Sequence, residues 1–298
     1  MLDGARIFHV NVNCRDLERS RAFYVDGCGL RDGVRTAPDE VQSGVAFGLV
    51  RARWDAWILV GAQGFEGGAI DLLEWQEPAP VGAAPGALYE SGFQRIGLLV
   101  PDIDAAIASA TAHGGTAWSE PLVHEIPSGG TVRIVLMSDP DGVALELIEG
   151  DASRLSFVSV ACTDLECSVA FYQRLGFREL ARFPSSNEAA SHLHVAGPVT
   201  MDEVLMRPPG GGDVHFMLVG FERPAVVRGD HRPANAVGMW RTALLVPALD
   251  DAYAALRAAG VEMLSDPQSM SMGAGLPDLR FVCFLGPDGE VLELIEQP

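Results

Sequence analysis

Several histidines of this chain stand where they could bind a metal or transfer a proton. His192 and His194 are two residues apart in a predicted strand, 191–195, so both side chains point to one face. This spacing suits two metal ligands or a proton relay, and it also suits an ordinary solvent-facing strand, which we favour. His215 lies in another predicted strand and would be a general acid or base, or a hydrogen-bonded structural histidine. His124 leaves the same two alternatives open.

Aromatic residues form a second group with possible chemistry. A slot for a flat ligand would be lined by Trp54, Trp57, Trp75, Phe47 and Phe65, although aromatic side chains in a sheet more often pack the core. The sequence shows no Ser/His/Asp or Cys/His nucleophile pattern and no dinucleotide-binding fingerprint. Covalent hydrolysis and nicotinamide chemistry are therefore not expected.

Composition limits the class of protein. A hydrophobic content of 48% with 20% charged residues predicts a compact globular chain, and a formal charge of −19 disfavours nucleic acid as a partner. The five cysteines are scattered without CxxC spacing, which argues against disulfides and a structural zinc site. No apolar run is long enough for a membrane span and no signal sequence is evident, so we expect a cytoplasmic protein without a membrane partner.

The elements that must position these residues come from an internal repeat. Residues 138–149 return almost unchanged at 286–296, and residues 16–24 return at 164–172. Each half divides again, which gives four modules. We therefore predict two domains, at 1–150 and 151–298, with modules at 1–76, 93–150, 151–222 and 239–298.

Each module reads as a βαβββ unit. In the first, an alternating strand at 7–12 precedes a helix at 17–24 with Asp16 as its N-cap, and strands follow at 44–49, 56–60 and 69–75. Helices are predicted likewise at 103–112, 165–175 and 249–259. The linkers 78–92 and 224–238 are rich in Pro, Gly and Ala and are expected to be partly flexible. The predicted class is α+β: two domains, each a curved eight-stranded sheet around a ligand-binding cleft, with helices outside.

Two motifs resemble a known family. They are His9-Val-x-Val-x-x-x-Asp16-Leu-x-x-Ser20-x-x-Phe-Tyr24 and Asp139-Pro-Asp-Gly-x-x-x-Glu146-Leu. Together with the four modules, they resemble the vicinal oxygen chelate superfamily, which includes glyoxalase I, bleomycin-resistance proteins and extradiol dioxygenases. The resemblance covers nearly the whole chain and implies the fold more specifically than the reaction.

The resemblance also implies where a metal would bind. In metal-using relatives the ligands come from the first and last strands of paired modules, and we call these positions corners. The first-strand corners here are His9, Arg95, Phe157 and Arg241, and the last-strand corners are Asp71, Glu146, Met217 and Glu293. Each half thus has an arginine at a corner, where its guanidinium would pair with a glutamate.

Two interpretations of these corners follow. In the one we favour, Arg95–Glu146 and Arg241–Glu293 are ion pairs that replace the ancestral metal. In the other, His9, Asp71 and Glu146 still hold a single divalent ion. The cofactor is therefore predicted to be either none or one divalent metal.

The predicted function is action on a small, oxygen-rich organic molecule, with isomerase-like or lyase-like chemistry in the cleft of the first half. His9, Glu146 and Arg95 would be catalytic, as proton-transfer group, base and clamp for an anionic oxygen. Substrate contacts would come from Asp71, Arg241, Glu293, Trp57 and His215.

Other functions are weighed against this one. The alternative is a binder that sequesters a drug or metabolite without chemistry, as bleomycin-resistance proteins do. Extradiol ring cleavage is disfavoured because Phe157 and Arg241 occupy the second half's first-strand corners. The sequence leaves a homodimer open, and also leaves open whether modules one and four share a cleft, in which case His9 and Asp71 would face Arg241 and Glu293.

Overall fold

The computed structural model describes residues 1–125, 130–187, 191–229 and 232–297, and these form four βαβββ modules. The helix starts show why the sequence folds this way locally. Asp16, Asp102 and Asp164 each accept a hydrogen bond from the backbone N–H three residues ahead, so each satisfies a helix N-terminus. The fourth helix begins after Ala248, which offers no such bond.

The first two modules contain these elements. Module one has β1 (Arg6–Asn13), α1 (Leu17–Ala22), the π-helical turn η1 (Phe23–Gly27), β2 (Arg31–Thr36), β3 (Gln42–Ser43), the 3₁₀ turn η2 (Val45–Phe47), β4 (Arg51–Gly61) and β5 (Gly64–Glu77). Module two has β6 (Gly92–Val100), α2 (Ile103–Ala112), β7 (Thr116–Ala117), β8 (Leu122–Glu125), β9 (Thr131–Ser138) and β10 (Ala144–Glu149).

The last two modules repeat this order. Module three has β11 (Arg154–Ala161), α3 (Leu165–Leu175), β12 (Arg178–Asn187), the 3₁₀ turn η3 (Ser191–Leu193), β13 (Val199–Arg207) and β14 (His215–Arg223). Module four has β15 (Gly238–Val246), α4 (Leu249–Ala258), β16 (Gln268–Met270), β17 (Leu279–Leu285) and β18 (Val291–Glu296).

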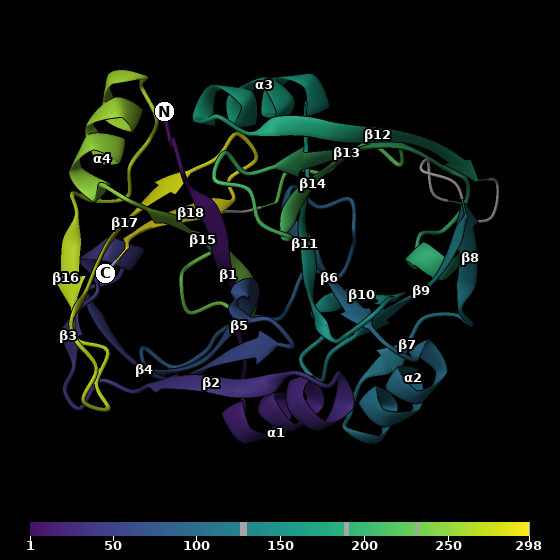
Figure 1. Ribbon diagram of the computed structural model, residues 1–298, viewed down its shortest axis with the longest axis horizontal. Helices are drawn as coiled ribbons and strands as arrows, with labels where there is room; N and C mark the ends of the chain where they lie inside the picture. Colours follow the sequence, from purple (N-terminus) through teal and green to yellow (C-terminus); the bar gives the residue numbers. More distant parts are fainter. Residues whose placement is uncertain (126–129, 188–190, 230–231, 298) are drawn as a thin grey trace.

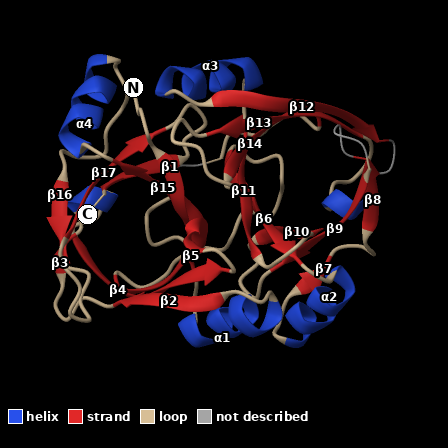
Figure 2. Cartoon of the chain, viewed as in Figure 1, coloured by secondary structure: helices blue, strands red, loops and turns tan. Residues whose placement is uncertain are grey.

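The strands form two mixed sheets that curl side by side, with helices on the outside (Figures 1 and 2). Sheet I has the order β16-β17-β18-β15-β1-β5-β4-β2, and β3 pairs with β4. Sheet II has the order β12-β13-β14-β11-β6-β10-β9-β7, and β8 pairs with β9. The predicted fold class is therefore confirmed.

Modules pair across the two halves of the sequence. Sheet I joins modules one and four through antiparallel β1 and β15, and sheet II joins modules two and three through antiparallel β6 and β11. The expectation that each half, 1–150 and 151–298, forms its own sheet is therefore wrong. The alternative that the sequence left open, in which modules one and four come together, is what the structure shows: His9 and Asp71 face Arg241 and Glu293.

The repeated Asp-Gly turns join modules within a half instead. In the first half, Asp141 accepts hydrogen bonds from the Arg15 backbone N–H and the Ser20 hydroxyl, at 3.0 and 3.3 Å. In the second half, Asp288 accepts from Thr163 and Ser168 in the same way. Sheets and turns together link the modules in a closed cycle, one to two, two to three, three to four and four to one.

Two local expectations are corrected. The segments 44–49 and 191–195 were expected to be strands, but each contains a 3₁₀ turn, η2 or η3. Gly48 ends η2 with φ +67°, a conformation that glycine adopts without strain. His192 and His194 therefore do not lie on a common strand face.

The two linkers are held against each other. Val81 donates its backbone N–H to Asn235 and accepts from Val237, and Val227 donates to Tyr89 and accepts from Ser91. These hydrogen bonds tie the described parts of the two linkers together, contrary to the partial flexibility that the sequence predicts. Within the described residues, no helix has the length and apolar character to cross a membrane.

Candidate functional site

The corners of sheet I meet in a buried charge cluster. Arg241 donates its Nη2 to Asp71 Oδ2 at 2.7 Å and its Nε to Glu293 Oε2 at 3.0 Å. His9 Nε2 lies 3.4 Å from the same Glu293 oxygen and 3.8 Å from Asp71 Oδ2. None of the four residues exposes more than 6% of its surface. Burial raises the pKa of Glu293, but Arg241 and His9 outweigh that effect and hold it below its ordinary value.

The same arrangement recurs in sheet II around Arg95. Its Nε donates to Glu146 at 2.8 Å, its Nη2 to Glu203 at 2.6 Å and its Nη1 to Gln94 at 2.6 Å. Burial lowers the pKa of Arg95, but Glu146 and Glu203 raise it above its ordinary value. Each sheet thus has one arginine that bridges a glutamate of its own module and an acidic residue of the partner module.

Sheet II differs from sheet I at the two remaining corners. Phe157 lies directly against β6, where a Cβ on Gly97 would be only 2.3 Å from its ring. The Arg95 guanidinium carbon is 5.5 Å from the centre of the same ring. Met217 occupies the last corner, on β14. Neither side chain is a ligand for a hard or borderline divalent ion.

An aromatic cluster centred on Phe47 packs beside Arg241 in sheet I. Phe47 of η2 stacks on Phe281 at 5.3 Å and meets the edges of Trp75 and Trp240 at 5.7 and 6.0 Å. The Arg241 guanidinium carbon is 5.3 Å from the centre of the Phe47 ring. Phe47 is therefore one of the aromatic residues that bury the Arg241 cluster.

The acidic pair of sheet II retains contact with solvent. The side chains of Glu146 and Glu203 are 12% and 16% exposed, against 4% and 3% for Asp71 and Glu293. Burial raises the pKa of Glu146 above its ordinary value, and Arg95 offsets only part of that rise. The acidic pair of sheet II is therefore more accessible to solvent than the acidic pair of sheet I.

The rings of Trp118 and His194 lie on the side of sheet II to which Glu146 points. Trp118 stacks on His194 with ring centres 4.3 Å apart and packs on the core cluster that contains Leu136 and Ala144. Ala144 and Glu146 are two residues apart on β10, so their side chains share a face. His194 has φ +51°, where Gly48 stands in module one, so its backbone carries strain of about 1 kcal/mol or more.

The residues present do not fit the divalent ion that the resemblance implies. In both sheets an arginine guanidinium lies between the carboxylates that would bind the metal, where the metal ion itself would have to lie. Among the residues that the structure describes, no group of three or more His, Cys, Asp or Glu side chains is arranged to hold a metal. We therefore derive no chemistry through a metal.

Not all predicted site residues come together. His9 and Asp71 lie in sheet I and Glu146 in sheet II, so these three cannot share an ion; Glu293 takes the place expected for Glu146 beside His9. The two ion pairs, Arg95–Glu146 and Arg241–Glu293, are both present as expected.

The remaining predicted residues lie apart from these clusters. Trp57 faces the helix side of sheet I, between Arg21 and Arg35, with guanidinium carbons 5.4 and 6.0 Å from its ring centre. His215 begins β14, next to Phe157 of β11 in the ladder, and burial lowers its pKa. Trp54 and Trp75 pack in the aromatic core around Phe47.

Two residues of the candidate site, Glu203 and Trp118, are not predicted by the sequence pattern. Glu203 lies on β13 between Met201 and Leu205, on the face of the strand that Met201 shares with the concave core. Period-two alternation would have placed it there, but only with knowledge that module three pairs with module two. Trp118 stands in a loop with no periodic signal.

The fold and its corners define a class of protein in which paired βαβββ modules direct side chains from their central strands to a common point. The family model described as Glyoxalase/Bleomycin resistance protein/Dioxygenase superfamily matches residues 6–147 and 154–294. The chain belongs to this superfamily.

Solved structures support the fold alone. Glyoxalase I from Zea mays is 17% identical, with 98% of this chain and 92% of that chain covered and a TM-score of 0.67. A putative dioxygenase from Bacillus subtilis is 13% identical, with 98% and 85% covered and a TM-score of 0.62. No curated protein matches the sequence.

Proposed function

We propose that this protein binds a small organic molecule on the concave face of sheet II without a metal ion. The observation that supports this most is the partial exposure of the Glu146 and Glu203 side chains, 12% and 16%, against 4% and 3% for Asp71 and Glu293 of sheet I. The stacked rings of Trp118 and His194 offer a flat surface for a planar ligand.

The charge of the site suggests the polar group of the ligand. Arg95 uses its Nε, Nη1 and Nη2 on Glu146, Gln94 and Glu203, so it orients the carboxylates instead of clamping an anionic oxygen, the role that the sequence suggested. Two carboxylates around one guanidinium leave acceptors in excess. We therefore expect ligands that donate hydrogen bonds, such as phenols and polyols.

A matched pair of probes tests this binding. Resorcinol should bind the protein, and its dimethyl ether, which has the same ring but no donors, should bind roughly tenfold more weakly or not at all in calorimetric titration. Glu203→Gln should weaken resorcinol binding by a similar factor. Glu222→Gln, an exposed glutamate on β14, is the control. Equal binding of both probes would contradict the proposal.

Metal content provides a second test. Protein purified without an affinity tag or chelator should contain far less than one equivalent of divalent ion by elemental analysis, because Arg95 and Arg241 hold the carboxylates that would bind it. One equivalent of bound ion in the parent protein would overturn the proposed replacement of metal by arginine. Arg257→Ala, which changes an exposed arginine, should have the same low content.

Proton transfer is a second candidate function, and the raised pKa of Glu146 favours it. In that case the protein is an isomerase-like or lyase-like enzyme in which Glu146 takes a proton from the bound molecule. Glu146→Gln separates the two functions: an enzyme loses turnover and keeps its ligand, whereas a binder shows no turnover in either form.

A further inference from the structure

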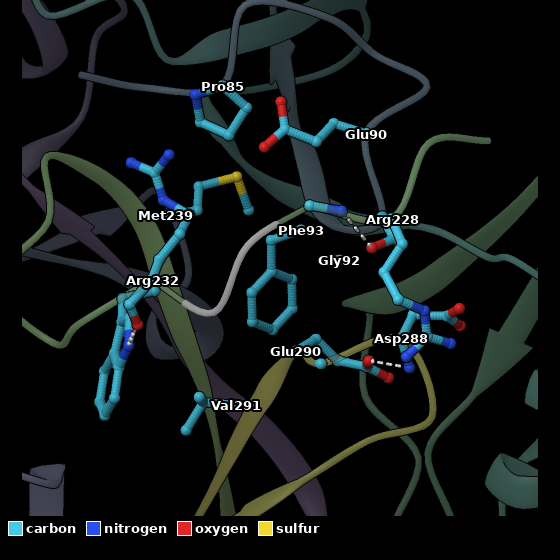
Figure 3. Close-up of a pocket in the computed structure, with 14 residues that line it drawn as sticks. Pro85, Glu90, Gly92, Phe93, Arg228, Arg232, Met239, Asp288, Glu290 and Val291 are labelled. Carbon is cyan, nitrogen blue, oxygen red and sulfur yellow. Dashed lines mark hydrogen bonds between the residues drawn. The ribbon is translucent and has the colours of Figure 1, made fainter. Parts of the chain in front are cut away.

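A cavity of about 260 Å³ lies between the two sheets, and its wall residue Trp240 separates it from the Arg241 guanidinium, whose carbon is 5.9 Å from the centre of the Trp240 ring (Figure 3). Its roof consists of the two interlinked linkers, represented by Glu90 and Ser91 and by Arg228 and Arg232. Its floor is apolar and comes from Phe93 of β6, Met239 and Trp240 of β15 and Val291 of β18.

Three carboxylates line the cavity, and two of them, Asp288 and Glu290, already have donors; the third, Glu90, lies in the roof and acts on Arg232. Asp288 accepts from the Thr163 backbone and hydroxyl at 2.6 and 2.7 Å and from the Ser168 hydroxyl at 2.6 Å. Glu290 accepts from the Tyr172 hydroxyl at 2.7 Å and from the Asp288 backbone at 2.9 Å. These bonds direct both acids toward α3, so they do not need a cationic ligand.

The two arginines on the cavity wall, Arg228 and Arg232, have no charge-matched hydrogen-bond partners among the described residues. The hydrogen bonds of Arg228 and Arg232 to described residues go to neutral oxygens, not to carboxylates. Arg232 is fixed by hydrogen bonds from Nη2 to the Ala83 and Val237 carbonyls, both 2.6 Å, and Arg228 makes one long bond of 3.5 Å to the Thr163 hydroxyl. Figure 3 shows the two side chains on opposite sides of the Phe93 ring.

Arg232 is more buried than Arg228, and its surroundings favour a bound anion. Burial lowers its pKa and Glu90 offsets only part of that, whereas carboxylate partners raise the pKa of the buried Arg95 and Arg241. Arg232 is thus a half-buried cation held in place by neutral carbonyls, beside an apolar floor. A bound anion would supply the missing counter-charge.

We propose that this cavity is a second ligand site, for a small organic carboxylate whose acid group pairs with Arg232 and whose aromatic or aliphatic body lies on Phe93, Met239 and Trp240. Arg228, which is exposed at the rim, adds attraction for the anion. The apolar floor selects against inorganic anions, and the size of the cavity limits the body to about one ring with a short chain.

The test compares three probes of one shape on the parent protein: 3-phenylpropionate, its neutral amide and 3-phenylpropylamine. Calorimetric titration should detect the carboxylate and find the amide and the amine at least roughly tenfold weaker. Because this comparison needs no variant, it holds even where a substitution disturbs folding. Equal affinity for acid and amide would overturn the proposal.

Variants then locate the site. Arg232→Gln, which can still donate to one linker carbonyl, should weaken 3-phenylpropionate roughly tenfold, and Arg228→Ala a few-fold. Arg257→Ala removes the same charge far from the cavity and should change nothing. Unchanged affinity in Arg232→Gln would overturn the assignment. Competition between resorcinol and 3-phenylpropionate would also overturn it, because the sheet II site and the cavity are separate.

Discussion

Arg241→Met should destabilise the protein by about 3–5 kcal/mol, because it leaves two buried carboxylates without their cation. Asp71 and Glu293 are 3% and 2% exposed and share this one guanidinium. His9 is the only other basic side chain within 4.0 Å of them in the described part of the chain. Urea denaturation at pH 7.5 measures the loss as a lower midpoint.

The matched variants make this result specific. Arg95→Met should cost less than Arg241→Met, because the Glu146 and Glu203 side chains keep 12% and 16% of their surface in solvent. Combining Arg241→Met with Asp71→Asn and Glu293→Gln should restore much of the stability, since a neutral cluster leaves no unpaired charge. If Arg241→Met unfolds at the same urea concentration as the parent, the cluster does not hold the two modules together.

Stability should fall as pH rises from about 4 to about 7, and Asp139 and Glu290 are the reason. Burial raises the pKa of each to about 7, from ordinary values of 3.8 and 4.5. Tyr24 donates to Asp139 and Tyr172 donates to Glu290, so the two groups are counterparts in the two halves. Within this pH range the folded protein keeps protons that the unfolded chain releases, so each rise in pH favours unfolding.

The effect should be on the order of 3 kcal/mol per group and should level off above about pH 7. Asp139→Asn and Glu290→Gln carry no titrating proton, so each should flatten the slope and be more stable than the parent at pH 8. Asp278→Asn, at an exposed aspartate, should keep the parent's slope. Urea midpoints measured from pH 4 to pH 8 check this. A parent that becomes more stable over this range would contradict the interpretation.

The modules could be predicted from the sequence because their signals are local. The motif beginning at His9 and ending at Tyr24 marks a strand and a helix, and Asp16 caps that helix as expected. The module pairing is not local. The first strand of every module has an edge that any other first strand could meet, and the choice between β15 and β6 for β1 depends on long-range contacts.

The sequence predicts some residues of the candidate site and misses others. Counting residues from Asp16 identified the His9 corner and its equivalents, and the Arg95–Glu146 and Arg241–Glu293 pairs followed from charge. Glu203 was missed because its partner lies in another module, and Phe47 gave no sign that it would cover Arg241. The cytoplasmic location and the open homodimer stay predictions.

The pairing of the first module with the last also sets the order in which the protein can fold during synthesis. All strands of sheet II lie between residues 92 and 223, so this sheet has its full sequence while the chain is still being made. Strand β1, at residues 6–13, must wait for β15 at residues 238–246. Until then one edge of β1, whose side chains are mostly buried in the finished fold, has no partner, and an unpaired strand edge favours aggregation of the newly made first module.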